Sequence, residues 1–141
     1  MGYEDTLSSV PLFSGLEKSD LARLAKVVVA RSYRKGEAIV KEGEQAVAFY
    51  VISKGKVEIQ KGGKTLNTLG PGEPFGEMAL LDGYPRATTN VAAEDGTECL
   101  VMTRWDFTAE LHANPSIVLA MLPVMSKRIR ELEERLQEHR A

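Results

Sequence analysis

Two charged residues, Glu77 and Arg86, are of interest because the residues around them suit the binding of an anion. They lie nine positions apart in the stretch PFGEMALLDGYPRATT, residues 74–89. The run GEMALL follows a cluster of glycines and predicts one or two helical turns, whose first amides have no partner within the helix. Such amides, together with the helix dipole, favour a negatively charged group. Arg86, which we expect at the start of a strand, can fold back over the same place and hold two phosphate oxygens.

Glu77 would repel an anion, so its presence points to a second feature of the ligand. A carboxylate beside an anion site is useful when the ligand also carries a hydroxyl donor, and a sugar phosphate has both groups. The alternative is that Glu77 and Arg86 form an ion pair with each other, which we expect when the site is empty. An ion pair alone does not explain the nearby glycines or the small residues Ala79 and Ala87. The pattern therefore favours a sugar-phosphate site.

The composition of the 141-residue chain argues against several other kinds of site. A formal charge of −2 does not favour nucleic-acid binding, so we expect no nucleic-acid partner for this chain alone. The single cysteine, Cys99, excludes an internal disulfide and a cysteine-rich metal site, and its apolar neighbours predict a buried strand. With only two histidines besides, we expect no metal and no cofactor. No apolar run reaches the length of a membrane span and no signal pattern is present, so we expect a cytoplasmic protein without a membrane partner.

Three zones of different composition predict a single domain. In the first zone, residues 7–31 read as helical, and Ser19 or Asp20 can cap a helix. The second zone holds short β-rich runs separated by glycine turns, which favours a small antiparallel barrel or jelly roll. The third zone is helical again. The predicted bounds are 1–32 for the N-terminal helical segment, 33–104 for the β-rich zone and 105–141 for the C-terminal helices, within a domain of 1–141.

The C-terminal zone contains a long amphipathic helix, which Asn114 and Pro115 would begin. Pro123 lies inside this helix and should kink or break it, either as a static bend or as a hinge. Apolar residues at 4-3-4-3-4 spacing form a heptad stripe, which can pack on the barrel or pair with the same stripe of a second chain. The second arrangement would give a homodimer through this helix. The stripe consists of Val118, Leu122, Met125, Ile129, Leu132 and Leu136.

The motifs around Glu77 and Arg86 follow one another as Phe75-Gly76-Glu77, Met78-Ala79-Leu80-Leu81 and Pro85-Arg86-Ala87-Thr88. This order resembles the phosphate-binding cassette of the cyclic-nucleotide-binding domain family, which includes sensor modules of protein kinase A regulatory subunits, catabolite activator proteins and cyclic-nucleotide-gated channels. The stretches VPLFSGLEKSDLARLA, GEAIVKEGE, FYVISKGKVEI and LGPGEPFGE resemble the helical segment, strands and turns of the same family. The resemblance implies an α+β fold: an eight-stranded antiparallel β-roll, similar to a jelly-roll barrel, with N-terminal helices, a cassette at 75–89 and a long C-terminal helix.

The resemblance also implies roles for individual residues. Arg86 would hold the cyclic phosphate and Glu77 would accept the ribose 2′-hydroxyl, while backbone amides of the cassette complete the cradle. In this family a residue of the final helix usually covers the base, and Lys127, Arg130 and Glu131 are candidates by their position along the chain. The implied ligand-binding residues are Phe75, Gly76, Glu77, Met78, Ala79, Arg86, Ala87 and Thr88.

Two departures from the family pattern bear on the ligand. Members that select cGMP often have a threonine directly after the arginine, whereas this chain has Ala87, which favours cAMP; Thr88 could still supply a similar hydroxyl. Asn90 occupies a position that is usually apolar, so we expect its strand to be partly exposed or locally irregular.

The resemblance implies a regulatory module that binds cAMP in preference to cGMP, catalyses no reaction and signals through movement of its C-terminal helix. One alternative is a fragment of a transcription regulator without its helix-turn-helix. Another is a domain that has lost nucleotide binding and only dimerises, which the intact Glu77 and Arg86 oppose. A relative that senses haem or an iron–sulfur cluster is disfavoured by the single cysteine and the lack of a well-placed histidine.

Overall fold

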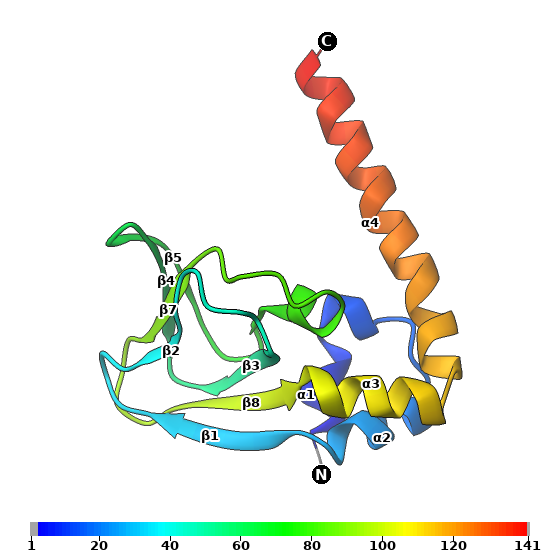
Figure 1. Cartoon of the computed structure of the whole chain (residues 1–141), viewed down its shortest axis with the longest axis horizontal. Helices are drawn as coiled ribbons and strands as arrows, with labels where there is room; N and C mark the ends of the chain where they lie inside the picture. Colours follow the sequence, from blue (N-terminus) through cyan, green and yellow to red (C-terminus); the bar gives the residue numbers. More distant parts are fainter. Residues whose placement is uncertain (1–2, 141) are drawn as a thin grey trace.

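The computed structural model describes residues 3–140, so the two ends of the predicted domain lie outside the described residues. Within them, eight antiparallel strands form two four-stranded sheets, and helices lie at both ends of the chain (Figure 1). This arrangement confirms the predicted α+β fold. The strand order is β1-β8-β3-β6 in one sheet and β2-β7-β4-β5 in the other. The strands are β1 (Val29–Tyr33), β2 (Ala38–Val40), β3 (Ala48–Lys54), β4 (Val57–Lys61), β5 (Lys64–Leu69), β6 (Pro74–Phe75), β7 (Thr89–Ala92) and β8 (Thr97–Thr103).

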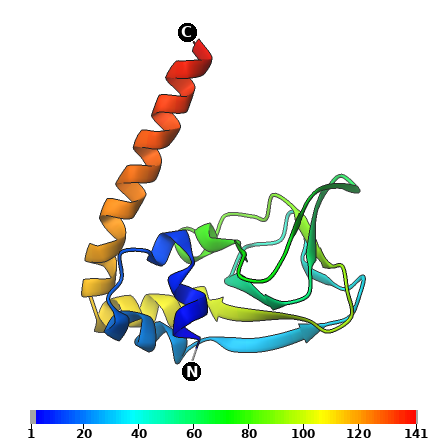
Figure 2. The same cartoon turned by 180° about the vertical axis from the view of Figure 1, so that it is seen from behind.

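The N-terminal helices and α3 gather at one end of the β-roll, and α4 starts there and then projects away from the rest of the molecule (Figures 1 and 2). Residues 131–140 of α4 are all exposed. A short 3₁₀ helix, η2, lies between β6 and β7. The helices are α1 (Glu4–Ser8), η1 (Pro11–Phe13), α2 (Lys18–Ala25), η2 (Glu77–Leu80), α3 (Arg104–Ala113) and α4 (Ser116–Arg140).

Two apolar cores hold these elements together. In the larger one, the ring of Phe13 packs edge to face on Phe49 with centroids 5.9 Å apart, and Phe107 lies 6.1 Å from Phe13. Burial of each phenylalanine contributes about 1.5–3 kcal/mol, so these rings join η1, β3 and α3. The smaller core lies inside the roll and consists of Val40, Ile52, Val57, Phe75 and Cys99.

Cys99 in β8 is fully buried, which confirms its predicted place in a buried strand. Burial, and to a lesser degree the charge of Glu98, raises the pKa of its thiol to about 12. The thiol therefore stays protonated at neutral pH and does not act as a nucleophile in the folded chain.

The N-terminal helical zone is shorter than predicted. Helix α2 ends at Ala25 and β1 begins at Val29, so the last four residues of the predicted segment 1–32 belong to a strand. Every residue of β1 pairs with β8, and this backbone pairing outweighs the local helical spacing. At the other boundary, α3 begins at Arg104, one residue earlier than predicted.

The predicted helix cap at Ser19 or Asp20 is also wrong, because Glu17 precedes the first turn of α2. Asp20 is buried and its carboxylate has a different use. It accepts a hydrogen bond from Arg23 at 2.6 Å and from the hydroxyl of Ser116 at 3.2 Å. Asp20 thereby ties α2 to the first residue of α4.

Helix α4 departs from the sequence-based expectations at two proline-containing sites. It continues through Pro123 as one helix, so the predicted break is absent. The fixed φ of proline suits a helix, and the two flanking segments of good helix formers maintain the element despite the lost hydrogen bond. At its start, Asn114 does not serve as a side-chain cap; its amide nitrogen donates to Glu110 of α3 at 3.3 Å.

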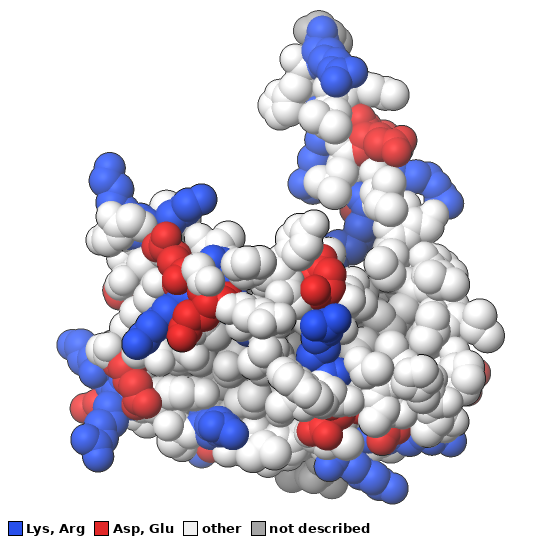
Figure 3. Space-filling model, in the orientation of Figure 1, with Lys and Arg blue, Asp and Glu red and all other residues white. Residues whose placement is uncertain are grey.

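Charged side chains of both signs are interspersed on the face drawn in Figure 3. Lysines and arginines alternate with acidic residues over the roll and along α4. On this face the described residues form no continuous basic surface of the kind that nucleic acids require. Among residues 3–140, no helix combines the length and the apolar character needed to cross a bilayer.

Candidate functional site

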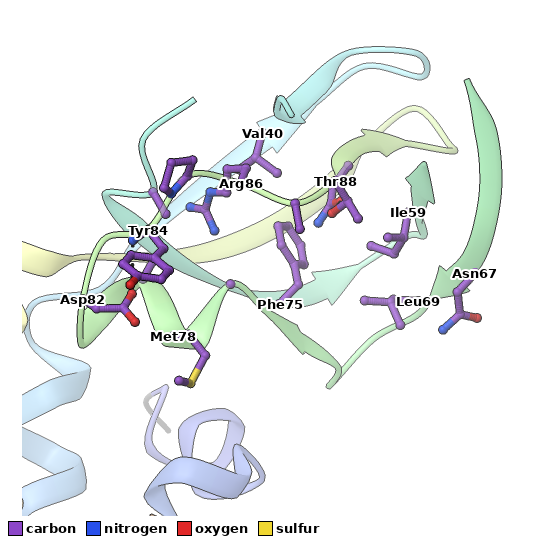
Figure 4. Close-up of a pocket in the computed structure, with 16 residues that line it drawn as sticks. Val40, Ile59, Asn67, Leu69, Phe75, Met78, Asp82, Tyr84, Arg86 and Thr88 are labelled. Carbon is purple, nitrogen blue, oxygen red and sulfur yellow. Dashed lines mark hydrogen bonds between the residues drawn. The ribbon is translucent and has the colours of Figure 1, made fainter. Parts of the chain in front are cut away.

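A cavity of about 450 Å³ opens in the β-roll, between the second sheet and the segment from β6 to β7. Its volume lies in the range of small-molecule sites, which is about 300–1,000 Å³. Apolar side chains from β2, β4 and β5 form one wall, and Arg86 lies at the opposite end from Asn67 and Leu69 (Figure 4). Seven of the eight predicted ligand-binding residues line this cavity: Phe75, Gly76, Met78, Ala79, Arg86, Ala87 and Thr88.

Arg86 is held in place by contacts on two sides. The sequence predicted Arg86 at the start of a strand. In the structure it lies in the segment before β7, because β7 begins only at Thr89. Its Nη2 donates to the carbonyl oxygen of Ala48 at 2.5 Å, and its guanidinium lies 5.7 Å from the centroid of the Tyr50 ring. Tyr50 in turn stacks on Phe75, with centroids 4.9 Å apart and planes at 8°. The guanidinium is therefore fixed before any ligand arrives.

Gly76 explains how the chain can pass so close to Arg86. Its φ of 76° lies in the left-handed region, which favours glycine, and a Cβ at this position would collide with the Nη1 atom of Arg86. Gly76 therefore has two structural roles: it allows the backbone turn before η2, and it leaves space for the Arg86 side chain. Of the glycines that precede GEMALL in the sequence, Gly70 and Gly72 have no atom within 4 Å of an added Cβ, so only Gly76 is needed for this close approach.

The electrostatics of Arg86 leave its positive charge without a local counter-ion. Burial lowers the pKa of Arg86 from its ordinary value, while Tyr50 and Glu44 raise it. An arginine remains protonated even so, because its ordinary pKa is far above neutral pH. Within the described residues, no carboxylate lies within ion-pair distance of Arg86. The site thus holds a partly desolvated cation at the edge of an apolar cavity.

The expected ion pair between Glu77 and Arg86 is absent. The Oε1 atom of Glu77 instead accepts a hydrogen bond from Nη1 of Arg128 in α4, at 3.5 Å. The pairing fails because Arg86 is turned toward Ala48 and Tyr50. The second oxygen of Glu77, Oε2, is buried and has no hydrogen-bond partner in the described part of the chain. An unsatisfied buried carboxylate oxygen is unfavourable, and a ligand hydroxyl would satisfy it.

Sequence reasoning missed Arg128. The candidates for covering the base, Lys127, Arg130 and Glu131, are all exposed, and Arg130 donates to Ser126 of its own helix. The structure does not bring these three to the cavity. The heptad stripe contained a usable signal, because Arg128 lies three residues after Met125 and four before Leu132, on the same helix face. That face meets the cassette around a smaller apolar cavity of about 220 Å³, which Met78, Met125 and Leu132 help to line.

Asn90 was expected to lie in a strand that is partly exposed or locally irregular. It is 4 % exposed, so the predicted exposure is wrong, whereas the predicted irregularity is confirmed by a register shift where β2 meets β7. Its Oδ1 atom accepts a hydrogen bond from the hydroxyl of Thr88 at 2.8 Å. Both side chains line the cavity.

Comparison with known proteins places this chain in a family. The family model described as cyclic nucleotide-binding domain matches residues 30–114. The chain is 36 % identical over 128 residues to the cyclic AMP receptor protein of Thermus thermophilus, a match that covers 87 % of this chain and 59 % of that protein. It is 43 % identical over 88 residues to the cAMP-dependent protein kinase regulatory subunit of Debaryomyces hansenii, covering 62 % and 20 % of the two chains.

Solved structures agree with the sequence matches. The N-terminal domain of a transcriptional regulator from Streptomyces coelicolor superposes with a TM-score of 0.85 at 27 % identity, covering 94 % of this chain and 95 % of that one. The Thermus thermophilus catabolite activator protein superposes with a TM-score of 0.70 at 36 % identity, covering 90 % and 62 %. The chain thus spans only part of the curated relatives described above. From the matched residues and the shared fold, the chain belongs to the cyclic nucleotide-binding domain family.

Proposed function

We propose that this chain is a sensor module that binds cAMP in the β-roll cavity and catalyses no reaction. The observation that carries this proposal is Arg86, a half-buried cation without an ion-pair partner among the described residues, beside an apolar cavity. A desolvated cation is stabilised by an anion, and a cyclic nucleotide carries an anionic phosphate together with a flat purine base that can pack on apolar side chains. Arg86 would hold the phosphate while the apolar wall covers the base.

Glu77 supports a ribose in the ligand. Its buried Oε2 has no partner within residues 3–140, and the cassette residues on either side of it line the cavity. A ribose 2′-hydroxyl is a donor of suitable size for this oxygen. Glu77 and Arg86 would then contact two neighbouring groups of one cyclic nucleotide.

The surroundings of Ala87 support cAMP over cGMP. Ala87 has no hydroxyl to offer a guanine base. Thr88 has one, but its hydrogen is donated to Asn90 at 2.8 Å. The cGMP-selective pattern has a threonine hydroxyl directly after the arginine. In this chain no free hydroxyl donor for guanine is present at that position.

We infer that α4 responds to the ligand through Arg128. The Arg128–Glu77 contact, at 3.5 Å, joins α4 to the residue that would receive the ribose. A ribose hydroxyl on Glu77 would weaken this contact, and the difference in affinity between the two positions of α4 would drive the change. Pro123, which lies five residues before Arg128, remains our candidate hinge for that movement, the alternative being a static bend.

We also propose a homodimer through α4. Leu122, Ile129, Leu132 and Leu136 of the heptad stripe are each more than half exposed, and the second half of α4 lies away from the body of the molecule (Figure 1). Pairing with the same stripe of a second chain would cover them.

A second candidate role is the sensor part of a transcription regulator. The observation in its favour is the superposition over 95 % of the N-terminal domain of a transcriptional regulator. This role does not conflict with cAMP binding, since it concerns the output and not the ligand.

Calorimetry with cAMP, cGMP and a cyclic dinucleotide, measured in parallel on the full chain, tests the proposed ligand. We expect cAMP to bind with the highest affinity. Binding of only the cyclic dinucleotide would replace the proposed ligand, and no binding of any of the three would overturn the proposed function.

A further inference from the structure

Asn90 is an unusual residue in the cavity because it is polar, almost fully buried and surrounded by apolar side chains. It is 4 % exposed, and its cross-strand partners are Ile59 in β4 and Val40 in β2. Both partners line the same cavity. A buried amide lowers stability unless its donors and acceptor are hydrogen-bonded, so the position calls for a partner.

Thr88 fixes the direction in which this amide faces. Its hydroxyl donates to Oδ1 of Asn90 at 2.8 Å, which leaves the Nδ2 hydrogens without a partner among the described residues. Oδ1 has a second lone pair, so it can accept one further hydrogen bond. Held in this way, the amide offers a donor and an acceptor side by side and cannot exchange them without breaking the bond to Thr88.

The place of Asn90 in the cavity decides which part of the ligand it would meet. Arg86 lies at one end, Thr88 lies between Arg86 and Ile59, and Leu69 and Asn67 lie beyond (Figure 4). Thr88 immediately precedes β7, and Asn90 lies two positions further on, within the strand. Both side chains line the cavity and are joined by the hydrogen bond between them, so Asn90 lies beside Thr88 on the same wall. A ligand whose phosphate is at Arg86 would extend along this wall and place its base beside Asn90.

A fixed donor and acceptor distinguish the two common purines. Adenine offers an acceptor, N7, beside a donor, the 6-amino group, and an asparagine amide matches both. Guanine offers two acceptors, N7 and O6, so one of them would face Oδ1 of Asn90. We propose that Asn90, oriented by Thr88, is a specificity-determining residue that binds the N7 and 6-amino groups of adenine. This inference rests on the proposed function and names a base-reading residue for it.

Calorimetry on the full chain and on Asn90→Val tests this inference. The probes are cAMP, cGMP and 7-deaza-cAMP, in which a carbon replaces the N7 acceptor. We expect the wild-type chain to bind cAMP about ten- to hundredfold more tightly than cGMP, and 7-deaza-cAMP about tenfold more weakly than cAMP, as expected for one well-formed base contact. In Asn90→Val, cAMP and 7-deaza-cAMP should bind equally, and the preference over cGMP should shrink.

Two further variants make the result specific. Thr88→Val keeps the amide but removes the bond that orients it, so the preference for cAMP over cGMP should shrink here as well. Asn67→Val is the matched control, because Asn67 lines the same cavity but is exposed and accepts from the backbone of Thr68. It should leave the preference unchanged.

The outcomes separate this inference from the proposed function. If the wild-type chain binds no cyclic nucleotide, both are overturned. If it binds cAMP but Asn90→Val still binds 7-deaza-cAMP more weakly than cAMP by the wild-type factor, only the role of Asn90 is overturned. The same holds if Asn67→Val is the variant in which this difference in affinity disappears. Thermal unfolding of each variant verifies that it is folded.

Discussion

The cassette and helix α4 each contribute one arginine to the comparison, Arg86 and Arg128, and the two are held in different ways. Arg86 is half-buried between a carbonyl oxygen, an aromatic ring and a glycine that leaves room for it. Arg128 is 43 % exposed and has a single 3.5 Å contact with Glu77. Buried contacts to a charged group are strong, whereas exposed ion pairs contribute about 0–1 kcal/mol. The proposed ligand-binding group is thus fixed, whereas the group proposed to respond to the ligand is held by one weak contact.

The largest effect should come from Arg86→Ala. Loss of a charge-assisted contact to the phosphate should cost on the order of 2–4 kcal/mol, so cAMP affinity should fall by tens- to hundreds-fold. Calorimetry measures this, and Arg31→Ala, on the exposed strand β1, is the control. Equal affinities for the wild-type chain and Arg86→Ala would remove Arg86 from the site.

The next effect concerns assembly through α4. We expect light scattering to give twice the chain mass of 15.5 kDa at micromolar concentration, and the chain mass for Leu132→Asp and for a chain that ends at Ser126. Each leucine buried in a dimer contributes about 1.5–3 kcal/mol, and a carboxylate in its place would oppose pairing. Glu131→Asp, next to the stripe, should remain a dimer. A wild-type monomer with and without cAMP would contradict this proposal.

Gly76→Ala should weaken binding although the substitution replaces no charged residue. Its left-handed φ costs a substituted residue about 1–2 kcal/mol, and the added Cβ displaces Arg86. Gly72→Ala is a matched control, because its φ of 86° is equally unfavourable but no atom lies within 4 Å of the added Cβ. We expect Gly76→Ala to lose about tenfold more cAMP affinity than Gly72→Ala. Similar losses would show that the arginine is not held by the glycine.

Pro123→Ala tests whether α4 moves at its proline. With spin labels near Lys61 and Gln137, the distance should change on cAMP addition in the wild-type chain and stay constant in Pro123→Ala, which should still bind cAMP. The alanine restores the missing backbone donor and stiffens the helix. A change in both proteins, or in neither, would mean that Pro123 is not a hinge.

The smallest effect should come from Arg128→Ala. Because the contact with Glu77 is largely exposed, its loss should change cAMP affinity by about fivefold or less. The same label pair should show α4 in its ligand-bound position without ligand. If Arg128→Ala lost as much cAMP affinity as Arg86→Ala, Arg128 would be a ligand-binding residue too, which would contradict the different roles proposed for the two arginines.

The fold and the cassette were predictable because their signals are local in the sequence. Glycine turns, short strands and the order of Glu77 and Arg86 identify the roll and its site. The partner of Glu77 was not predictable, because Arg128 meets it only through the position of α4. The start of β1 at Val29 was missed for a similar reason, since pairing with β8 decides it. Burial of Asn90 likewise depends on β2 and β4, which flank it in the sheet.

The structure of the chain with cAMP bound tests the central claim most directly. We predict that the cyclic phosphate accepts hydrogen bonds from Arg86, that the 2′-hydroxyl donates to Glu77, and that Arg128 is released from Glu77. A nucleotide bound elsewhere, with Arg86 bonded only to Ala48, would contradict the account.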